Sequence, residues 1–390
     1  MITTRPDRTR PLKTHQLDAK HGIVCHLPDD KRGYFGWPTV ARLESGRLIV
    51  AASGCRSHHP CPWGETTINI SDDDGATWSE RRTIHSSPLD DRDAGVVDLG
   101  GGTILVSWAS VDVREQVKDP KSAAAFQDMV GMEEWESWCP TLESLTDEEV
   151  AAHSGAWIML SHDNGETWGE KVRTPVYSPH GPIRSRDGDL IYLGKTFIES
   201  KMEQHYSPVV CYRSSDNGVT WKQVGEVPPA PTTLHENFCE PDIVELASGK
   251  LIGMVRCSGF STGNGGMLNF SMAQSESMDG GRTWTPLRLL NFPGAPPQII
   301  QHSSGAVILA YGYRLIPWSQ RIAISRDEGA NWECRWLLRD DVPDWDLGYP
   351  STVELGDGSL FTVYYQKVPG NSRCSLISSR WQLPDGDSYR

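Results

Sequence analysis

The sequence predicts an all-β fold, a six-bladed β-propeller of four-stranded antiparallel blades with a helical insertion in blade two. Three observations support this prediction. Six segments share the form of a β-hairpin, five copies of one short phrase follow these segments, and the 390 residues include 37 glycines and 26 prolines, a composition typical of a chain rich in turns. A repeat of this kind at intervals of about 50 to 60 residues indicates propeller blades.

The hairpins are the first repeated element. In each, two apolar runs flank a turn that contains glycine, which is the pattern of two antiparallel strands joined by a tight turn. The six segments are VARLESGRLIVAA (40–52), VVDLGGGTILVSW (96–108), IRSRDGDLIYLG (183–194), IVELASGKLIGMV (243–255), IIQHSSGAVILAY (299–311) and TVELGDGSLFTVY (352–364).

The second repeated element is a phrase that we expect to fasten the turn between the outer two strands of a blade. In the first copy, Asp73 can accept bonds from backbone amides, Gly75 can adopt a positive φ, and Trp78 can bury its ring between blades. We expect a structural role for all five copies. They are SDDDGATW (71–78), SHDNGETW (161–168), SSDNGVTW (214–221), SMDGGRTW (277–284) and SRDEGANW (325–332).

The chain ends predict how the ring closes. The sixth hairpin is followed by CSLISSRW (374–381), a candidate third strand, and HGIVCHL (21–27) could supply the outermost strand of the same blade. We therefore expect a propeller over residues 20–385, an N-terminal extension over 1–19 and a tail over 386–390. Residues of about 111–155 are rich in helix formers and interrupt blade two; they could cap the site, mediate oligomerisation or decorate the surface.

Composition excludes several classes of function. The net charge of −14 and the pI near 5.3 argue against a nucleic-acid surface, and no apolar run is long enough to span a membrane. No secretory signal is visible, so we expect a cytoplasmic protein, and the nine scattered cysteines suit reduced thiols. Cys55 and Cys61 flank two histidines, but no second cluster completes four ligands, so we expect no metal and no cofactor.

Polar and aromatic residues cluster where the inner strand of each blade should enter the central channel. Aromatic faces can stack on a sugar ring, and arginines can bind a carboxylate through two bonds, so the set suits a carbohydrate. The candidates are Trp37, Asp91, Arg92, Asp93, His180, His235, Glu236, Glu240, Gln298 and Tyr349, with Arg56, His58, Arg256 and Arg314 at strand ends. Structural packing and ion pairing are the alternatives for each of them.

The five phrases resemble the Asp-boxes of the sialidase superfamily, and the six hairpins resemble its six blades. The resemblance implies a tyrosine nucleophile paired with a glutamate, an aspartate as acid and base, and three arginines around the substrate carboxylate. It places Tyr349 of DLGYPSTVEL as the nucleophile and Glu240 as its partner. It places Arg256 as the second arginine, and the third is either Arg314 or Arg321.

Two features depart from that family pattern. FGWPTV has Gly36 and Trp37 where the first arginine should lie, and GCRSHHPCPWGET (54–66) contains no aspartate to act as the acid. His58 or His59 could supply the proton instead, because histidine titrates near neutrality. Arg56 or Arg92 could reach in to replace the missing arginine.

These features together predict an exo-acting glycoside hydrolase that removes a terminal acidic sugar other than ordinary sialic acid. Its partner is then an oligosaccharide or glycoconjugate, with neither nucleic acid nor membrane. A lyase acting on a uronic acid is the first alternative, since arginines could neutralise the carboxylate while tyrosine or histidine removes the C5 proton. A non-catalytic sugar-binding propeller is the second.

Overall fold

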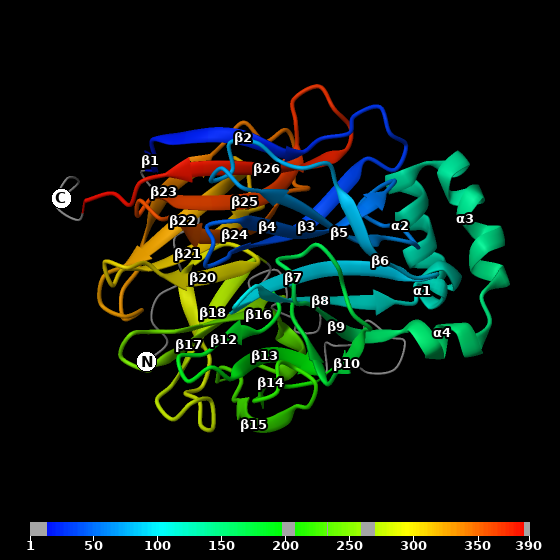
Figure 1. Cartoon of the computed structure of the whole chain (residues 1–390). Coiled ribbons are helices and arrows are strands. Elements are labelled where there is room, and N and C mark those ends of the chain that lie inside the picture. The colour runs from blue at the N-terminus through cyan, green and yellow to red at the C-terminus, as the bar shows by residue number, and fades with distance from the viewer. Residues whose placement is uncertain (1–13, 197–206, 232, 259–269, 386–390) are drawn as a thin grey trace.

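The computed structural model describes residues 14–196, 207–231, 233–258 and 270–385, which form six antiparallel sheets arranged as a ring (Figure 1). The predicted tail 386–390 and residues 1–13 of the predicted extension lie outside the described residues. The prediction of a six-bladed propeller is therefore confirmed.

The first three blades follow the chain from the inner strand outwards. Blade 1 contains β3 (Tyr34–Arg42), β4 (Leu48–Arg56), β5 (Glu65–Ser71) and β6 (Arg82–Ser86). Blade 2 contains β7 (Asp90–Gly100), β8 (Thr103–Val111), β9 (Gly155–Ser161) and β10 (Val172–Thr174). Blade 3 contains β12 (Ile183–Arg184), β13 (Leu190–Thr196), β14 (Val209–Ser214) and β15 (Lys222–Val227), and the short β11 (Val176–Tyr177) also pairs with β13.

The remaining blades repeat this order. Blade 4 contains β16 (Phe238–Glu245), β17 (Leu251–Cys257), β18 (Ser271–Ser277) and β19 (Arg288–Pro293), and a short 3₁₀ turn, η1 (His235–Asn237), precedes it. Blade 5 contains β20 (Pro297–Gln301), β21 (Val307–Tyr313), β22 (Ser319–Ser325) and β23 (Glu333–Arg339), with β1 (His15–Gln16) parallel to β23. Blade 6 contains β24 (Gly348–Glu354), β25 (Leu360–Lys367), β26 (Cys374–Trp381) and β2 (Ala19–Cys25).

Blade 6 is built from both ends of the chain. Strand β26 has the predicted bounds, and β2 pairs with it antiparallel, with Ala19 opposite Trp381 and His21 opposite Ser379. The predicted closing strand is thus confirmed, although it begins at Ala19 rather than His21. Because β2 joins the last blade to the first, the ring is closed by backbone hydrogen bonds.

The repeated phrase forms the turn between the third and fourth strands, as predicted. In blade 1, Asp73 accepts the backbone N–H of Thr77 at 2.9 Å and its hydroxyl at 2.6 Å, and Ser71 Oγ accepts the N–H of Gly75 at 2.9 Å. Gly75 has φ of 83°, and the Trp78 ring lies 6.0 Å from that of Phe361 in blade 6. The same aspartate bonds recur at Asp163, Asp216, Asp279 and Asp327.

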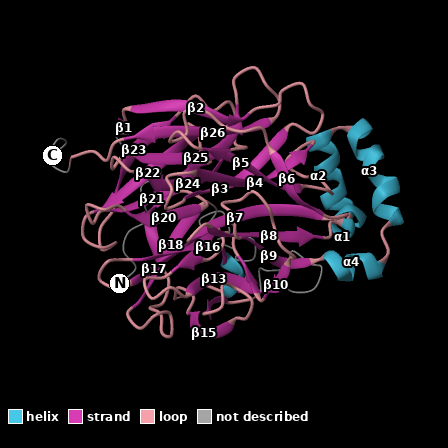
Figure 2. Cartoon of the chain, viewed as in Figure 1, coloured by secondary structure: helices cyan, strands magenta, loops and turns pink. Residues whose placement is uncertain are grey.

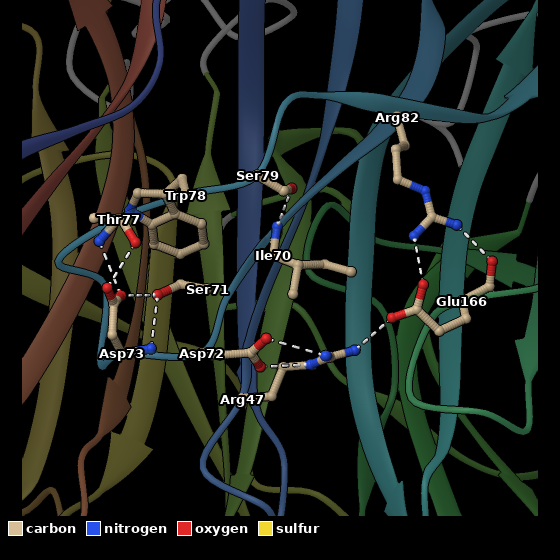
Figure 3. A pocket seen from close by; sticks show the side chains of 10 residues that line it. All are labelled: Arg47, Ile70, Ser71, Asp72, Asp73, Thr77, Trp78, Ser79, Arg82 and Glu166. Atoms are coloured by element: carbon tan, nitrogen blue, oxygen red, sulfur yellow. Dashed lines mark hydrogen bonds and ion pairs between the residues drawn. The ribbon is translucent and has the colours of Figure 1, made fainter.

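A surface hollow between blades 1 and 2 surrounds the first of these turns (Figure 3). Arg47 lines this hollow and pairs with Asp72 at 2.7 Å and with Glu166 of the next blade at 2.8 Å. Lys250 makes the corresponding link in blade 4, donating to the carbonyl of Glu328 in blade 5 at 2.6 Å. The charged side chains that line this hollow form ion pairs with one another, so we infer that the hollow holds blades 1 and 2 together and is not a ligand site.

Four helices connect β8 to β9 and lie together at one side of the propeller (Figure 2). They are α1 (Arg114–Lys118), α2 (Pro120–Val130), α3 (Met132–Ser144) and α4 (Asp147–His153). Trp135 and Trp138 of α3 are buried in a cluster that Trp63 of blade 1 also contacts, so apolar packing holds the insertion on the ring. Among the described residues, no helix is long and apolar enough to cross a membrane.

Side chains on the inner strands bind the inner strand of the next blade. Asp242 accepts the N–H of Ile299 at 2.7 Å, and Gln298 accepts the N–H of Thr352 at 3.0 Å. Ser351 continues the series into blade 1, where its hydroxyl accepts the N–H of Val40 at 3.1 Å. These bonds satisfy buried backbone donors and fix neighbouring inner strands relative to one another.

Candidate functional site

Four inner strands share an irregularity near their first residues. In β3, β7, β16 and β24 the register shifts, and each shift contains one non-glycine residue with positive φ. The residues are Trp37 (54°), Asp93 (58°), Glu240 (48°) and Tyr349 (47°). Such a conformation is costly for a side-chain-bearing residue, and it persists at functional sites where a bulge turns a side chain away from the strand.

The bulges bring Tyr349 and Glu240 together across the ring. Tyr349 Oη donates to Glu240 Oε1 at 2.7 Å. Arg256 Nη1 from β17 lies 2.8 Å from both carboxylate oxygens and 3.5 Å from Tyr349 Oη. The arrangement joins a phenol, a carboxylate and a guanidinium in one contiguous group.

The electrostatics of this group favour a neutral phenol beside an ionised carboxylate. Burial and the Glu240 carboxylate raise the pKa of Tyr349 well above its usual value, and Arg256 and Arg314 oppose that shift only in part. Burial opposes the ionisation of Glu240, but Arg256 and the hydrogen bonds lower its pKa below the usual value. Glu240 is therefore available to accept the proton of Tyr349.

Of the two alternatives for the third arginine, the structure brings Arg314 to this group. Its guanidinium lies 5.6 Å from the centre of the Tyr349 ring and donates to the carbonyl of Leu347 at 2.8 and 3.0 Å and to Tyr365 Oη at 2.9 Å. Arg321 instead stacks on the ring of Tyr313, at 3.5 Å, and bonds Ser319. Arg321 is thus placed within blade 5 and away from Tyr349.

On the side of the candidate site that blade 1 forms, Trp37 contacts three other candidate residues. Its ring lies 6.3 Å from that of Tyr349, and the guanidinium carbons of Arg56 and Arg92 lie 4.7 and 4.4 Å from the ring centre. Arg56 is fully buried and forms a bidentate pair with Asp90. The side chain of Arg92 keeps 15% of its surface exposed and lies no closer than 3.5 Å to Asp90, so it has donors left for a ligand.

Two of the predicted aspartates, Asp91 and Asp93, would share a face of a regular strand, but the bulge at Asp93 turns the two side chains in different directions. Asp93 lies at the bulge, bonds the hydroxyl of Tyr177, and leaves its buried Oδ1 without a hydrogen bond. Asp91 is fully buried and accepts bonds from the hydroxyls of Ser87 and Ser110. Asp93 therefore belongs to the cluster around Tyr349, whereas Asp91 supports the interior of blade 2.

The loop between β4 and β5 carries both predicted histidines. His59 Nδ1 lies 2.8 Å from Asp346 Oδ1, and its ring lies 5.1 Å from that of Trp37. His58 is partly buried, leaves Nδ1 without a partner, and has a pKa lowered by burial while Glu134 of α3 opposes the shift. His59 is accordingly the histidine that shares a contact, Trp37, with Tyr349.

Four other predicted residues lie elsewhere. His180 and Gln298 line a hollow of about 410 Å³ in the central channel, where His180 Nδ1 contacts the Thr39 hydroxyl at 3.0 Å. Arg42 and Glu245 also line this hollow, which therefore extends toward the opposite ends of the inner strands. His235 and Glu236 lie on η1; His235 faces Glu226 at 3.9 Å, and the Glu236 charge acts on the buried Lys195.

Sequence reasoning missed three residues that complete the site. Asp346 binds His59, Asp90 binds Arg56, and Tyr34 bonds Asp346. Asp346 lies only three residues before the candidate Tyr349, so its closeness in the sequence is a signal that could have found it. Asp90 directly precedes the predicted Asp91, and only the strand alternation separates their roles. Among the described residues, no group of three or more His, Cys, Asp or Glu could hold a metal.

A six-bladed ring with Asp-box turns and a Tyr–Glu–Arg group on its inner and second strands defines the sialidase class of propeller. Residues 129–362, more than half of the chain, match the family model described as the BNR repeat-like domain. The chain therefore belongs to the BNR repeat-like family of the sialidase superfamily.

Solved structures share the fold at low identity. A protein of unknown function from Dyadobacter fermentans is 20% identical with a TM-score of 0.72, covering 94% of this chain and 99% of its own. The Hadza microbial sialidase is 20% identical (TM-score 0.63; 93% and 68% covered). The Trypanosoma rangeli sialidase bound to the inhibitor DANA is 16% identical (TM-score 0.58; 89% and 55% covered). No curated protein sequence matched the chain.

Proposed function

We propose that the protein is an exo-acting glycoside hydrolase that removes a terminal acidic sugar from an oligosaccharide or glycoconjugate. The observation that carries this proposal is the 2.7 Å bond from Tyr349 Oη to Glu240, whose carboxylate Arg256 holds ionised. A neutral tyrosine becomes an effective nucleophile when an adjacent base takes its proton during the attack. The family membership and the sialidase folds above support the same class of chemistry.

The first step forms a covalent glycosyl–tyrosine. Tyr349 Oη attacks the anomeric carbon and transfers its proton to Glu240, while the bond from that carbon to the leaving oxygen breaks. The leaving oxygen takes a proton from His59, which supplies the acid that the missing aspartate cannot. Arg256 stays within 3.5 Å of the phenolic oxygen and stabilises its developing negative charge.

The second step hydrolyses that intermediate. Water attacks the anomeric carbon, His59 accepts one of its protons, and the bond from the carbon to Tyr349 Oη breaks. Glu240 returns the proton to the phenolic oxygen, so the enzyme regains its starting protonation. Displacement twice at the same carbon retains the anomeric configuration of the released sugar.

Three arginines support the choice of an acidic sugar. Arg256, Arg314 and Arg92 surround the Tyr349–Trp37 pair, and the buried Nε atoms of Arg256 and Arg92 have no hydrogen-bond partner. Buried donors without partners are costly, and a carboxylate could satisfy them with charge-assisted bonds. We infer that the site differs from one for ordinary sialic acid, because Trp37 and the stacked Arg92 occupy the side on which Gly36 stands at the place of an arginine.

A lyase acting on a uronic acid is the second candidate, and the same arginine cluster favours it. The arginines would neutralise the carboxylate, and the C5 proton would pass to neutral His59, or to Tyr349 once Glu240 has taken the phenolic proton. The glycosidic bond then breaks, and the leaving oxygen takes a proton from water. Elimination leaves a C4–C5 double bond that absorbs near 235 nm, whereas hydrolysis leaves none. Absorbance therefore separates the two candidates.

The test is a panel of sialosides, uronides and plant or microbial oligosaccharides, with products followed by mass spectrometry. We expect release of a saturated terminal acidic monosaccharide and, with its 2-deoxy-2-fluoro or 3-fluoro analogue, an adduct on the peptide that contains Tyr349. Tyr349→Phe should form no such adduct. Tyr311→Phe is its matched control, because the Tyr311 hydroxyl bonds the carbonyl of Cys334 within blade 5. Binding without any product would favour the non-catalytic propeller and overturn the proposal, as would absorbance near 235 nm.

A further inference from the structure

The loop from β4 to β5 and the start of β24 meet at His59 and Asp346. His59 Nδ1 lies 2.8 Å from Asp346 Oδ1, although the two residues are 287 positions apart in the chain. The histidine side chain keeps 27% of its surface exposed, while the aspartate side chain keeps 7%. One edge of the imidazole is thus fixed to a buried acid, and part of the ring stays accessible.

Asp346 receives donors on both of its oxygens. Tyr34 Oη lies 3.1 Å from each oxygen, and Cys374 Sγ lies 3.4 Å from Oδ2. Burial opposes its ionisation, but the charges of His59, Arg314 and Lys367 and the bond from His59 lower the pKa of Asp346 to about 2. The carboxylate is therefore ionised near neutrality and can only accept hydrogen bonds.

This pairing fixes the tautomer of His59. Because an ionised carboxylate has no proton to donate, Nδ1 must carry the hydrogen that joins it to Asp346. Nε2 then remains as the nitrogen that gains or loses the second proton. Rings of Trp37 and Trp345 lie 5.1 and 5.6 Å from the imidazole and restrict its rotation.

The charges that face His59 come from several elements. Asp346 of the segment before β24 raises its pKa, whereas burial, Arg92 of β7 and Arg314 after β21 lower it, with a net fall from the usual value. Tyr34 Oη of β3 lies 3.2 Å from Nδ1 and is itself held as a neutral phenol by burial and by Asp346. Asp346 is thus the acid that counteracts burial at this histidine.

We propose that Asp346 is a positioning residue that holds His59 with Nδ1 protonated and presents Nε2 as the proton donor and acceptor of the reaction. The proposal rests on the proposed function for its catalytic part. The His59–Asp346 pair takes the role that an aspartate alone has in the family pattern. Tyr34 holds the other side of the same carboxylate and supports its orientation.

The first experiment tests the pair without any substrate. Nitrogen-15 NMR of the full-length protein, with His59→Gln to assign the signal, reports the tautomer and the pKa of His59. We expect an Nδ1–H tautomer in the natural protein and a lower His59 pKa in Asp346→Asn, because the balancing negative charge is gone. An Nε2–H tautomer, or an unchanged pKa in Asp346→Asn, would overturn the proposal even if the glycosidase activity is real.

The second experiment tests the catalytic part on the sugar that the panel identifies, prepared as its methyl glycoside and its 2,4-dinitrophenyl glycoside. General-acid help contributes about 10²-fold or more when the leaving group is poor and little when it is good. We expect Asp346→Asn to lower kcat about a hundredfold on the methyl glycoside and less than about fivefold on the dinitrophenyl glycoside. The same loss on both compounds would indicate structural damage and overturn the proposal.

Asp357→Asn is the matched control, because this aspartate lies in the same blade, bonds Ser359 and Arg380, and makes no contact with His59. We expect the alkaline limb of its kcat–pH profile to stay where it is in the natural protein. The double variant His59→Gln with Asp346→Asn should lose no more activity than His59→Gln, since the aspartate acts through the histidine. Additive losses in the double variant would overturn the role of Asp346. Full activity in Tyr349→Phe would instead contradict the proposed function and leave the His59–Asp346 pair untouched.

Discussion

The Asp-box turns and the bulges of the inner strands are both repeated around the ring, yet they repeat different things. The turns repeat side chains: an aspartate binds its own turn in all five copies, and a serine caps the same glycine amide. The bulges repeat only backbone, since the positive-φ position holds four different residues, Trp37, Asp93, Glu240 and Tyr349.

This difference separates architecture from chemistry in the molecule. Every blade must make the same turn, so the residues that satisfy that turn recur. A catalytic centre needs one nucleophile, one base and one aromatic wall, so equivalent backbone positions in different blades can carry unlike groups. The strained bulge is the common device that turns these side chains out of their strands. Substitutions in the two regions should therefore change different measurable properties.

The largest expected effect is on Tyr349. Replacing it with Phe keeps the ring against Trp37 and removes the attacking oxygen, so we expect kcat to fall about 10³-fold or more with little change in stability. Steady-state kinetics and thermal unfolding of the same preparation check both statements. A Tyr349→Phe variant that is less stable but keeps the natural turnover would show that Tyr349 has a structural role and not a catalytic one.

A smaller effect is expected at Arg92. Replacing it with Met keeps the packing on Trp37 but removes the charge, and we expect kcat/KM for an acidic sugar to fall about a hundredfold. Arg321→Met is the matched control, because that arginine stacks on Tyr313 in blade 5 and should leave kcat/KM unchanged. Equal losses in the two variants would contradict a specific role for Arg92.

The pH profile should report the two titrating groups of the site. Glu240 must be ionised, and its lowered pKa keeps the carboxylate available well into the acidic range. His59 must be protonated to act as the acid, and its lowered pKa means that this form is lost as pH rises through a value below 6.5. We expect an acidic optimum and about a tenfold fall in kcat/KM per pH unit on the alkaline side. A plateau extending to pH 8 would exclude His59 as the acid.

In the turns, Ser71→Ala should affect stability instead of activity. The buried hydroxyl binds the N–H of Gly75 and Oδ1 of Asp73, so its loss should cost about 1 to 2 kcal/mol of unfolding free energy. Chemical denaturation measures this cost, and kcat/KM should change less than about twofold. Loss of turnover without loss of stability would show that the turn also serves the site.

The smallest effect is expected where one turn already departs from the others. The fifth copy has Asn331 in place of threonine, and its side-chain amide donates to Asp327 Oδ2 at 2.8 Å. Threonine donates to the equivalent oxygen in the other copies. Asn331→Thr should therefore change the unfolding free energy by less than about 0.5 kcal/mol. A larger change, measured by denaturation, would mean that this turn is not equivalent to the rest.

The architecture could be predicted closely because its signals are local. The hairpins, the turn phrases and the last strand are each contained in about a dozen residues, and their periodicity is a property of short segments. The site was harder because its contacts join distant segments. The sequence marks Tyr349 and Glu240, but only the fold shows that Arg314 and not Arg321 reaches them, or that Asp90 and Asp91 face opposite sides of β7.

The pairing of β2 with β26 has a consequence for the order in which the protein can fold. During synthesis, Ala19 emerges long before Trp381, its partner across the sheet, has been added. Blades 1 to 5 draw their four main strands from continuous stretches and can assemble as the chain lengthens, whereas β2 stays without its partner strand until β26 has been added. Closure of the ring must therefore follow the synthesis of β26, whose pairing with β2 completes the blade that carries the Tyr349 bulge.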